Sequence, residues 1–482
     1  MNWIIFKKNE KINALDIKTL DIRQIKEDVK KFNFRPVGFF GKQEFENVRL
    51  YVVLADDKKG EFYVTSALFS KEDKTYPCFS DELPQFHLFE REFYEQFNIE
   101  PVNHPWLKPV RINQENYEFF KMQGENIHEV SVGPIHAGVI EPGHFRFMCQ
   151  GEKVYELEIM LGFQHRGIEN MMLKNPSNRL AESISGDSAV AHNMAYSEVL
   201  ETLSDTKIPE KAEIIRRVAL EAERIAIHIG DMGAIAGDMA YLPGASIFGV
   251  TRTLIINTML EITGSRFSRG LINTGGVNYD ITNEQISKFI KTLNEVETTV
   301  RRTTDVMLKT SSCISRMEKT GVVSQETIAS LGAVGMAARA SGVNLDSRFD
   351  FCDILYKKYK KQEFNGQGDV YSRFKLRYKE ILYSIKILKD LLEKLKNNND
   401  ILSVKPERLS SNSFALSITE GWRGEVIHIA ITGKDGELIR YKIKDPSFNN
   451  WYVLSMAVRN NGISDFPLCN KSFNLSYSGF DL

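Results

Sequence analysis

The alternation of apolar and polar residues predicts β-hairpins near both ends of the chain. In RLYVVLADDKKGEFYVTSALFS, two strand-like runs flank the five-residue charged turn Asp56–Gly60, as expected for a hairpin. GEVIHIAITG and ELIRYKIKD predict a second hairpin that turns at Lys434–Gly436. From VSVGPIHAG to LGFQHRGIE, three glycine-containing turns separate further strand-like runs, which predicts a small sheet.

Apolar residues at three- and four-residue spacing predict long helices in the middle of the chain. One helix opens near Pro209, and another follows a capping box formed by Thr282 and Gln285. A third runs through DVYSRFKLRYKEILYSIKILKDLLEKL and ends at the NNND sequence of residues 397–400. The apolar stripes of the first two helices are Ile214, Val218, Ala222, Ile225 and Ile229, and Phe289, Leu293, Val296, Val300 and Met307.

A short helix is predicted in FHLFEREFYEQF. Its phenylalanines form one face, which core packing explains. The remaining positions are dense in charge, and we interpret them as a surface for a partner. The two sets are Phe86, Phe89, Phe93 and Phe97, and Glu90, Arg91, Glu92 and Glu95.

These elements predict an α+β protein of two domains. We expect a small α/β domain over residues 1–112 and a polar linker over residues 113–130. A mainly helical domain with small β-sheets at its margins follows over residues 131–482.

Composition excludes several classes of function. The net charge is −1, so no basic surface argues for nucleic acid. No run of eighteen apolar residues exists, and the apolar part of the N-terminus is too short for a signal peptide. The glycine spacing matches neither a Walker loop nor a dinucleotide fingerprint. We therefore expect a cytoplasmic chain, either free or on the inner face of a membrane.

The five cysteines show no metal-site spacing. No two lie within four residues of each other, so there is no CxxC pair for zinc or an iron–sulfur cluster. Scattered single thiols are usually small buried hydrophobic groups. The cysteines are Cys78, Cys149, Cys313, Cys352 and Cys469.

Two segments carry candidate chemistry. GPIHAGVIEPGHFRF contains His136, Glu141 and His144, which would bind metal or relay protons. In the alternative, the histidines are satisfied by backbone groups in a turn-rich segment. The second segment is AESISGDSAVAHNMAY, which has hydroxyls around Asp187 and places His192 about one turn further on.

The hydroxyls of this second segment are those of Ser185 and Ser188. The small residues beside them would admit a cofactor or another backbone closely. In the alternative, Ser185 only caps a helix. A third segment, GMAARASGVNLDSRFD, concentrates Arg339, Asp346 and Arg348 among small residues; buried Arg–Asp pairs hold structure as often as they serve chemistry.

The last residues, GISDFPLCNKSFNLSYSGFDL, are apolar and aromatic. Such a stretch reads as buried, so we expect it to return to the core beside a site.

Taken together, these segments resemble the large subunits of membrane-bound group 4 nickel–iron (NiFe) hydrogenases and their relative, the 49-kDa-type subunit of respiratory complex I. The resemblance covers nearly the whole chain and rests on an ordered set of motifs. These are GPIHAGVIEPGHFRF, LGFQHRGIE, ERIAIHIGDMGAIAGD, TGGV, RASG together with Asp346 and Arg348 downstream of it, and GDVYSRF. Residues 80–110 are similar to the 30-kDa-type subunit of complex I, which implies a fusion as in formate hydrogenlyase and hydrogenase-4.

The resemblance implies that the metal ligands are lost. In these hydrogenases, an ICGIC motif and a DPCxxC motif each supply two cysteines to nickel and iron. The first frame reads ISGDS here, with Ser185 and Ser188 at the ligand positions. The second aligns with SFNLSYSG and places Ser476 and Gly479 there. Because a NiFe centre needs thiolates, we expect no metal and no other cofactor in this chain.

Quinone binding is implied by location alone. In complex I, a histidine in the first β-turn and a tyrosine near the ISGDS position are associated with the quinone head. His136 matches a histidine of that turn, but Pro142 falls where the quinone-associated one would lie. No tyrosine stands between Ala181 and Ser188.

The family implies the large subunit of a membrane-associated oxidoreductase complex that couples electron transfer to ion translocation. Its partners would be a small subunit with a 4Fe-4S cluster, a ferredoxin-like subunit and ion-translocating membrane subunits. A chamber would bind a small redox partner such as quinone; its lining would be Ser185, Asp187, Ser188, His192, Ser476 and Tyr477. Alternatively, His136, Glu141, His144 and Asp187 would relay protons. The alternative from another class is a non-catalytic coupling subunit with a collapsed chamber, and a hydrogenase with a new ligand set is a third.

Overall fold

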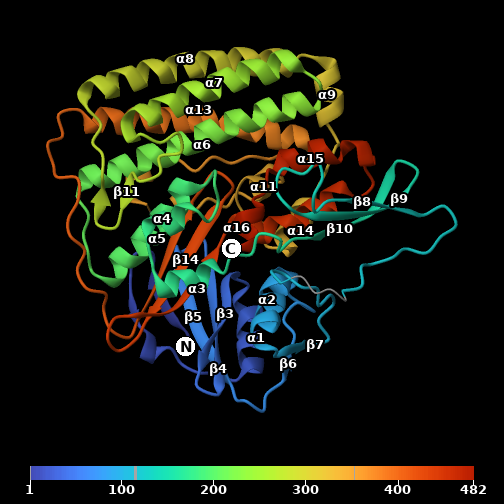
Figure 1. Cartoon of the computed structure of the whole chain (residues 1–482), viewed down its shortest axis with the longest axis vertical. Coiled ribbons are helices and arrows are strands. Elements are labelled where there is room, and N and C mark those ends of the chain that lie inside the picture. The colour runs from blue at the N-terminus through green and yellow to red at the C-terminus, as the bar shows by residue number, and fades with distance from the viewer. Residues whose placement is uncertain (1, 113–116, 352) are drawn as a thin grey trace.

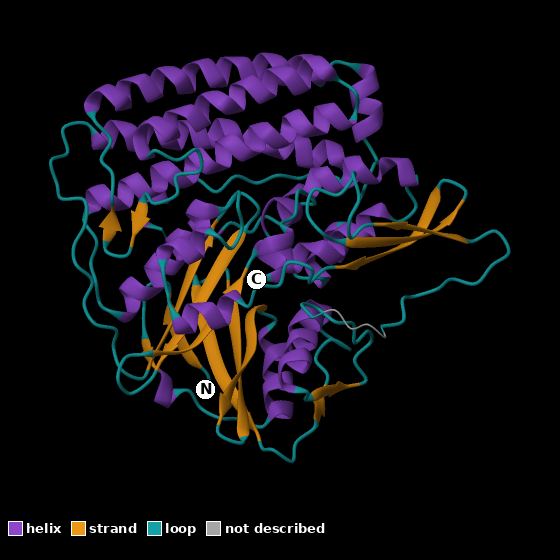
Figure 2. Ribbon diagram, viewed as in Figure 1, coloured by secondary structure: helices purple, strands orange, loops and turns teal. Residues whose placement is uncertain are grey.

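The computed structural model describes residues 2–112, 117–351 and 353–482, so part of the predicted linker and Cys352 lie outside the described residues. Its long helices gather in one layer, and its sheets and shorter helices lie below and beside that layer (Figures 1 and 2). The α+β class expected from the sequence is confirmed.

An antiparallel sheet of four strands forms the N-terminal part, in the order β1-β5-β4-β3. The predicted hairpin is confirmed: β4 and β5 pair from Val48 with Phe69 to Asp56 with Glu61, at the turn. The elements are β1 (Ile4–Lys7), α1 (Ile22–Phe32), β3 (Arg35–Glu44), β4 (Asn47–Asp56), β5 (Glu61–Phe69), β6 (Thr75–Pro77), α2 (His87–Phe97) and β7 (Glu100–Val102).

A second sheet of four strands packs against the first. Its order is β15-β14-β13-β2, so a short strand from the N-terminus completes a sheet formed by C-terminal residues. Apolar residues of both sheets share one buried cluster, which includes Phe62 and Ile429. The predicted second hairpin is β14 with β15. The strands are β2 (Ile12–Asn13), β13 (Ser413–Glu420), β14 (Glu425–Thr432) and β15 (Leu438–Lys444).

Four long helices form the layer at the top of Figure 1. The three predicted helices are confirmed as α6, α8 and α13, and the capping box of Thr282 with Gln285 makes both of its hydrogen bonds. The fourth helix, α7, was not predicted from the sequence. The bounds are α6 (Glu210–Asp238), α7 (Leu242–Thr263), α8 (Asn283–Met307) and α13 (Val370–Leu395).

The remaining helices and strands are shorter. A three-stranded sheet, in the order β10-β9-β8, lies beside the C-terminal helices. The elements are β8 (His128–Val132), β9 (His144–Gln150), β10 (Lys153–Met160), α3 (Ile168–Lys174), α4 (Asn178–Glu182), α5 (Ala189–Leu203), β11 (Ile272–Asn273), β12 (Gly276–Val277), α9 (Ser311–Met317), α10 (Gln325–Ser330), α11 (Gly335–Ala340), α12 (Ser347–Asp350), α14 (Pro446–Val458), α15 (Phe466–Phe473) and α16 (Tyr477–Asp481).

The charged face of α2 is not a partner surface, so that interpretation was wrong. Glu90, Arg91 and Glu92 are buried. The carboxylate of Glu90 accepts the backbone N–H groups of Phe79 and Ser80 at 2.8 Å. Arg91 and Glu92 likewise bond within the chain. These charges anchor neighbouring segments, because buried charges need partners.

The C-terminal residues are buried, as expected. The carboxylate of Asp481 is fully buried and accepts the backbone N–H groups of Gly162 and Gln164 at 2.7 and 2.8 Å. Among the helices of the described residues, none combines the length and the apolar character needed to cross a membrane.

Candidate functional site

The two segments that were expected to line a common chamber do meet. The hydroxyl oxygens of Ser185 and Ser476 lie 2.9 Å apart, although 291 residues separate them in sequence. The Ser476 hydroxyl also accepts the backbone N–H of Gly479 at 2.9 Å, which caps α16. α5 starts after Ser188 rather than after Ser185, so the alternative that Ser185 only caps a helix is wrong.

Arg423, which the sequence analysis missed, occupies the space between these segments. Its guanidinium forms a two-point ion pair with Asp187, with N–O distances of 2.6 and 2.7 Å. The same group lies 3.2 Å from the hydroxyl of Ser188 and 3.4 Å from that of Ser185. Arg423 is buried. Burial lowers its pKa, but the charge and the hydrogen bonds of Asp187 outweigh this effect and raise the pKa.

The turn between β13 and β14 presents Arg423 to the site. Trp422 is fully buried and donates its indole N–H to the carbonyl of Asp187 at 2.8 Å. The guanidinium carbon of Arg423 lies 3.9 Å from the centroid of the Trp422 ring, a cation–π contact. The sequence around them, EGWRGE, is an arginine beside a tryptophan between two glycines. This local pattern would have indicated the turn from the sequence.

Asp445 fills the space beside Gly479, the fourth position singled out from the sequence. A Cβ atom built on Gly479 would lie only 2.7 Å from the carboxylate carbon of Asp445. That carboxylate lies 3.0 Å from Nε2 of His192, and both side chains are fully buried. Burial raises the pKa of Asp445, but the hydrogen bond and the charge of His192 outweigh burial and lower it.

His192 continues into a hydrogen-bonded chain. Its Nδ1 lies 3.2 Å from Nε2 of His428, and Nδ1 of His428 lies 2.8 Å from the hydroxyl of Tyr441. All three side chains are buried. Burial, followed by the proximity of His192, holds the pKa of His428 well below its ordinary value. Neither His428 on β14 nor Tyr441 on β15 was predicted from the sequence.

A cavity of about 520 Å³ adjoins the Arg423–Asp187 pair. Glu141, Asp231 and Tyr477 are among the residues that line it. Burial, and then the charge of Asp187, raises the pKa of Glu141. Burial raises the pKa of Tyr477 to about 12. The cavity thus places a carboxyl with a raised pKa close to the ion pair.

The structure separates the two histidines of the first candidate segment from this site. His136 is exposed, and its Nδ1 accepts the backbone N–H of Gly138 at 3.0 Å. His144 places its Nδ1 3.0 Å from the carbonyl of Gly133. Both therefore match the alternative of satisfaction by backbone groups. Only Glu141 and Asp187 of the four predicted relay residues line the cavity.

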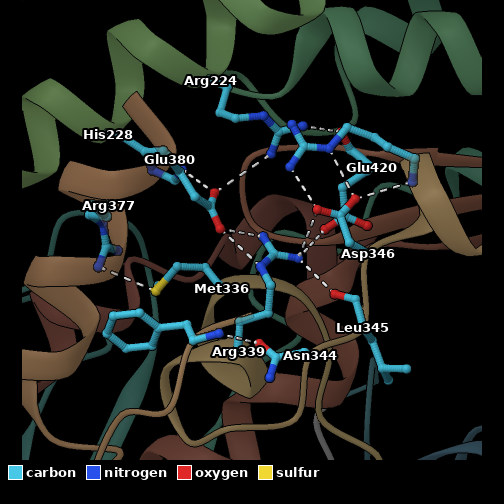
Figure 3. Close-up of polar contacts among 12 residues, drawn as sticks. Arg224, His228, Met336, Arg339, Asn344, Leu345, Asp346, Arg377, Glu380 and Glu420 are labelled. Atoms are coloured by element: carbon cyan, nitrogen blue, oxygen red, sulfur yellow. Dashed lines mark hydrogen bonds and ion pairs between the residues drawn. The ribbon is translucent and has the colours of Figure 1, made fainter. Parts of the chain in front are cut away.

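Behind the β13–β14 turn lies a second group of charges, drawn in Figure 3. It includes Arg339 and Asp346 of the third candidate segment, together with Glu380 and Glu420. These side chains are buried and paired with one another. Within residues 2–112, 117–351 and 353–482, no three His, Cys, Asp or Glu side chains gather as a metal site would require.

Comparisons with known proteins agree with the motifs. Residues 238–413 match the family model described as respiratory-chain NADH dehydrogenase, 49 Kd subunit. Formate hydrogenlyase subunit 5 of Escherichia coli (strain K12) is 27% identical over 503 aligned residues, which cover 96% of this chain and 88% of that protein. Hydrogenase-4 component G of the same organism is 27% identical over 452 residues, covering 87% and 78%. The predicted likeness to both is confirmed.

A solved structure shares the fold. It is titled as the membrane-bound sulfane sulfur reductase, an archaeal respiratory membrane complex. One of its chains superposes with a TM-score of 0.69 at 20% sequence identity, and the match covers 74% of this chain and 99% of that chain.

Proposed function

We propose that this chain is the large subunit of a membrane-associated oxidoreductase complex of the hydrogenase-4 and complex I type, and that it works without a NiFe centre. The similarity to formate hydrogenlyase subunit 5, over nearly the whole of both chains, supports the first part. The single observation that carries the second part is the Arg423–Asp187 ion pair, which stands among the positions where the family's hydrogenases have metal ligands.

The residues present do not fit a NiFe centre. Ser185, Ser188 and Ser476 offer neutral hydroxyls, and Gly479 offers no donor at all. Soft metals of this kind select thiolates, which bind as anions. In addition, the guanidinium of Arg423, neutralised by Asp187, donates to the hydroxyls of Ser188 and Ser185 at 3.2 and 3.4 Å, so the ion pair occupies the space beside these hydroxyls.

In this proposal, the cavity beside the pair is where a small redox partner, such as a quinone, accepts electrons from the 4Fe-4S cluster of a partner subunit. Glu141 is suited to exchange a proton with that molecule, because its raised pKa lies closer to neutrality than that of an ordinary carboxyl. Asp187 and Arg423 orient the bound molecule as a fixed pair of opposite charges.

The assembly follows from the same proposal. Residues 1–112 act as the 30-kDa-type domain, and the chain sits peripherally on the cytoplasmic side of the membrane. Its partners are a 4Fe-4S small subunit, a ferredoxin-like subunit and ion-translocating membrane subunits. Electron transfer through the chain is coupled to the movement of ions or protons in those membrane subunits.

A second candidate is a non-catalytic coupling subunit, favoured by the packing of the ligand positions themselves. Ser185 touches Ser476, and Asp445 fills the space beside Gly479. In this second candidate, the packed ligand positions bind no molecule, and the chain transmits conformational change to its partner subunits.

An experiment on the intact assembly separates the two candidates. The complex is purified with its native partners and assayed with a series of electron donors, quinones and other acceptors. Asp187→Asn keeps the shape of the side chain but removes its charge, and we expect it to lower electron transfer at least tenfold while the assembly stays intact. Asp435→Asn, at an exposed position in the β14–β15 turn, is the control and leaves the rate unchanged. Wild-type rates in Asp187→Asn would favour the non-catalytic subunit.

A further inference from the structure

The buried ion pairs behind the β13–β14 turn, part of which Figure 3 shows, join four carboxylates to three guanidinium groups. The side chains of this cluster come from α6, the α11–α12 region, α13 and the end of β13, and none is more than 6% exposed. The carboxylates are Glu221, Asp346, Glu380 and Glu420; the guanidinium groups are Arg224, Arg339 and Arg348; and His228 is the single imidazole.

These groups form one continuous network. Arg339 joins two carboxylates, with Nε 2.9 Å from Glu380 and Nη1 2.7 Å from Glu420. Arg348 pairs with Asp346 at 3.0 and 2.7 Å and reaches Glu221 at 3.1 Å. Arg224 lies 3.3 Å from Glu221 and 4.0 Å from Glu380. The protonation state of each carboxylate in the cluster therefore depends on the charges of the others.

The charges around the network are paired among themselves. Across the sheet, Glu425 on β14 stands opposite Glu420 and pairs with Lys444 and Arg35, and Arg35 also pairs with Asp57. On the other side, Asp231 pairs with Arg377 at 3.0 Å and with the partly exposed Lys471 at 3.6 Å. If every carboxylate of the cluster is ionised and His228 is neutral, a net negative charge remains in the interior, at a large free-energy cost. One retained proton removes it.

Two groups compete for that proton, and the contacts favour Glu420 over His228. Nε2 of His228 lies 2.9 Å from Glu380, so the neutral ring satisfies this contact with its proton on Nε2. Its Nδ1 is buried and has no partner among the described residues, so a second proton there would lack an acceptor. At Glu420, by contrast, Oε1 accepts from Arg339, and Oε2 accepts the hydroxyl and the backbone N–H of Ser347 at 2.9 and 3.1 Å. A proton on Oε2 would turn the hydroxyl contact round, so that Oγ of Ser347 accepts it and no polar atom of the group loses its partner.

The pKa shifts point the same way. Burial, followed by the charge of Asp346, raises the pKa of Glu420. Burial lowers the pKa of His228. Burial also opposes the ionisation of Glu380, but the charge of Arg339 outweighs it and holds the pKa of Glu380 well below its ordinary value.

Glu420 is also connected to the candidate site through the backbone of the β13–β14 turn. Arg224 donates to the backbone carbonyls of Glu420 and Gly421 at 2.6 and 2.9 Å, which fixes the start of the β13–β14 turn. Trp422 and Arg423 follow directly, and Arg423 makes the ion pair with Asp187. Only two residues therefore separate Glu420 of the cluster from Arg423 of the site.

We propose that Glu420 stores one buried proton and acts as a positioning residue, holding the β13–β14 turn so that Arg423 meets Asp187. Loss of this proton to solvent leaves an unbalanced carboxylate beside Asp346 and shifts the turn, and with it Arg423. This inference goes beyond the proposed function. It is tested on the full-length chain without measuring electron transfer, so the inference and the proposed function can fail independently.

The first test compares two isosteric substitutions within the cluster. Glu420→Gln mimics a protonated carboxyl, so we expect its melting temperature at neutral pH to stay within a few degrees of wild type. Glu380→Gln removes an ionised partner of Arg339, so we expect a clearly larger loss. If Glu420→Gln destabilises the chain as much as Glu380→Gln does, Glu420 is ionised and the proposal is wrong.

The second test uses Trp422 as the reporter, because its ring touches Arg423 and its indole N–H bonds Asp187. Its emission is obtained by subtracting the signal of Trp422→Phe from that of the wild type during a pH titration. We expect one step above the ordinary range of a glutamate, which disappears in Glu420→Gln and persists in Glu223→Gln, a buried carboxyl outside the cluster. A wild type without the step, or a step that survives in Glu420→Gln, would overturn the proposal.

Discussion

The carboxylate of Asp445 stands where a side chain on Gly479 would have to go. A Cβ atom at position 479 would lie 2.7 Å from the carboxylate carbon, and His192 holds that carboxylate in place at 3.0 Å. In the alignment proposed from the sequence, this position corresponds to a metal ligand of NiFe hydrogenases. Gly479→Cys alone would therefore not create a metal ligand, because Asp445 must move first.

Substitution at Gly479 tests this relationship. We expect Gly479→Ala to lower the free energy of unfolding by about 1–3 kcal/mol, the usual cost of overpacking a buried site. Denaturant unfolding measures the change. The matched control is Gly249→Ala on α7, where a Cβ meets open space and should stabilise the helix by about 0.5–1 kcal/mol. A Gly479→Ala variant as stable as the wild type would mean that Asp445 moves freely.

Removal of Arg423 tests whether the ion pair holds the pocket together. Arg423→Ala leaves the hydroxyls of Ser185 and Ser188 and the carbonyl of Asn474 without their donor. The side chain of Asp187 is about one third exposed, which moderates the cost of leaving its charge unpaired. We expect a loss of about 2–3 kcal/mol in unfolding free energy.

Arg423→Lys keeps the charge but cannot form the two-point pair, so we expect an intermediate loss. The control is Arg301→Ala, which removes an exposed pair with Glu297 on α8 and should cost less than about 0.5 kcal/mol. Equal stability of the Arg423 and Arg301 variants would contradict the account.

His192→Ala should destabilise the fold rather than act on chemistry alone. It removes the ion-pair partner of the fully buried Asp445 carboxylate, which keeps only the backbone N–H of Ser447 among these two contacts, at a cost of about 3–5 kcal/mol. Since the pKa of Asp445 is lowered in the folded state, the pair stabilises the protein above the ordinary aspartate value of about 3.9. That contribution is lost as the pH falls through the lower, folded value.

Urea unfolding of wild type and His192→Ala between neutral and acidic pH measures this contribution. The difference between the two should be large at neutral pH and shrink toward the acidic end. A constant difference would show that His192 does not stabilise the ionised carboxylate. Failure of His192→Ala to assemble is therefore a folding result and does not by itself indicate a structural role for the whole chamber.

Glu223 gives a pH dependence of the opposite sign. Burial, which outweighs the hydrogen bond from the backbone N–H of Val190, raises its pKa to about 8. Between the unfolded value of about 4.3 and 8, only the folded state keeps the proton. Stability therefore falls as the pH rises through this window, by at most about 1.4 kcal/mol per pH unit. Glu223→Gln should remove this part of the slope in unfolding experiments from pH 5 to 8; an unchanged slope would contradict a protonated Glu223.

Local patterns were sufficient for much of the fold. The capping box of Thr282 and Gln285 joins residues three positions apart, so the sequence alone contains both partners. The hairpin at Asp56–Gly60 is likewise set by its own turn and alternation. α7 was missed because its apolar residues do not form a single stripe: Leu242 and Val250, for instance, are each 68% exposed.

The site was predictable only in part. The ISGDS and SFNLSYSG segments were expected to meet, and the hydroxyls of Ser185 and Ser476 do. The groups that fill the pocket were not predictable, because Arg423 lies 236 residues from Asp187 and Asp445 lies 253 residues from His192. Only tertiary contacts bring such pairs together. The partner surface assigned to α2 was wrong for the same reason, since its charges pair with distant residues inside the chain.

The most direct test of the account is the nickel content of the intact assembly, measured together with hydrogen uptake. The complex is purified with its native partners from cells supplied with nickel, and a hydrogenase prepared in parallel serves as the positive control. Because the pocket offers a guanidinium, a paired carboxylate and three serine hydroxyls rather than thiolates, we predict no stoichiometric nickel and no hydrogen-dependent reduction of an acceptor. One nickel per chain, together with hydrogen uptake, would contradict it.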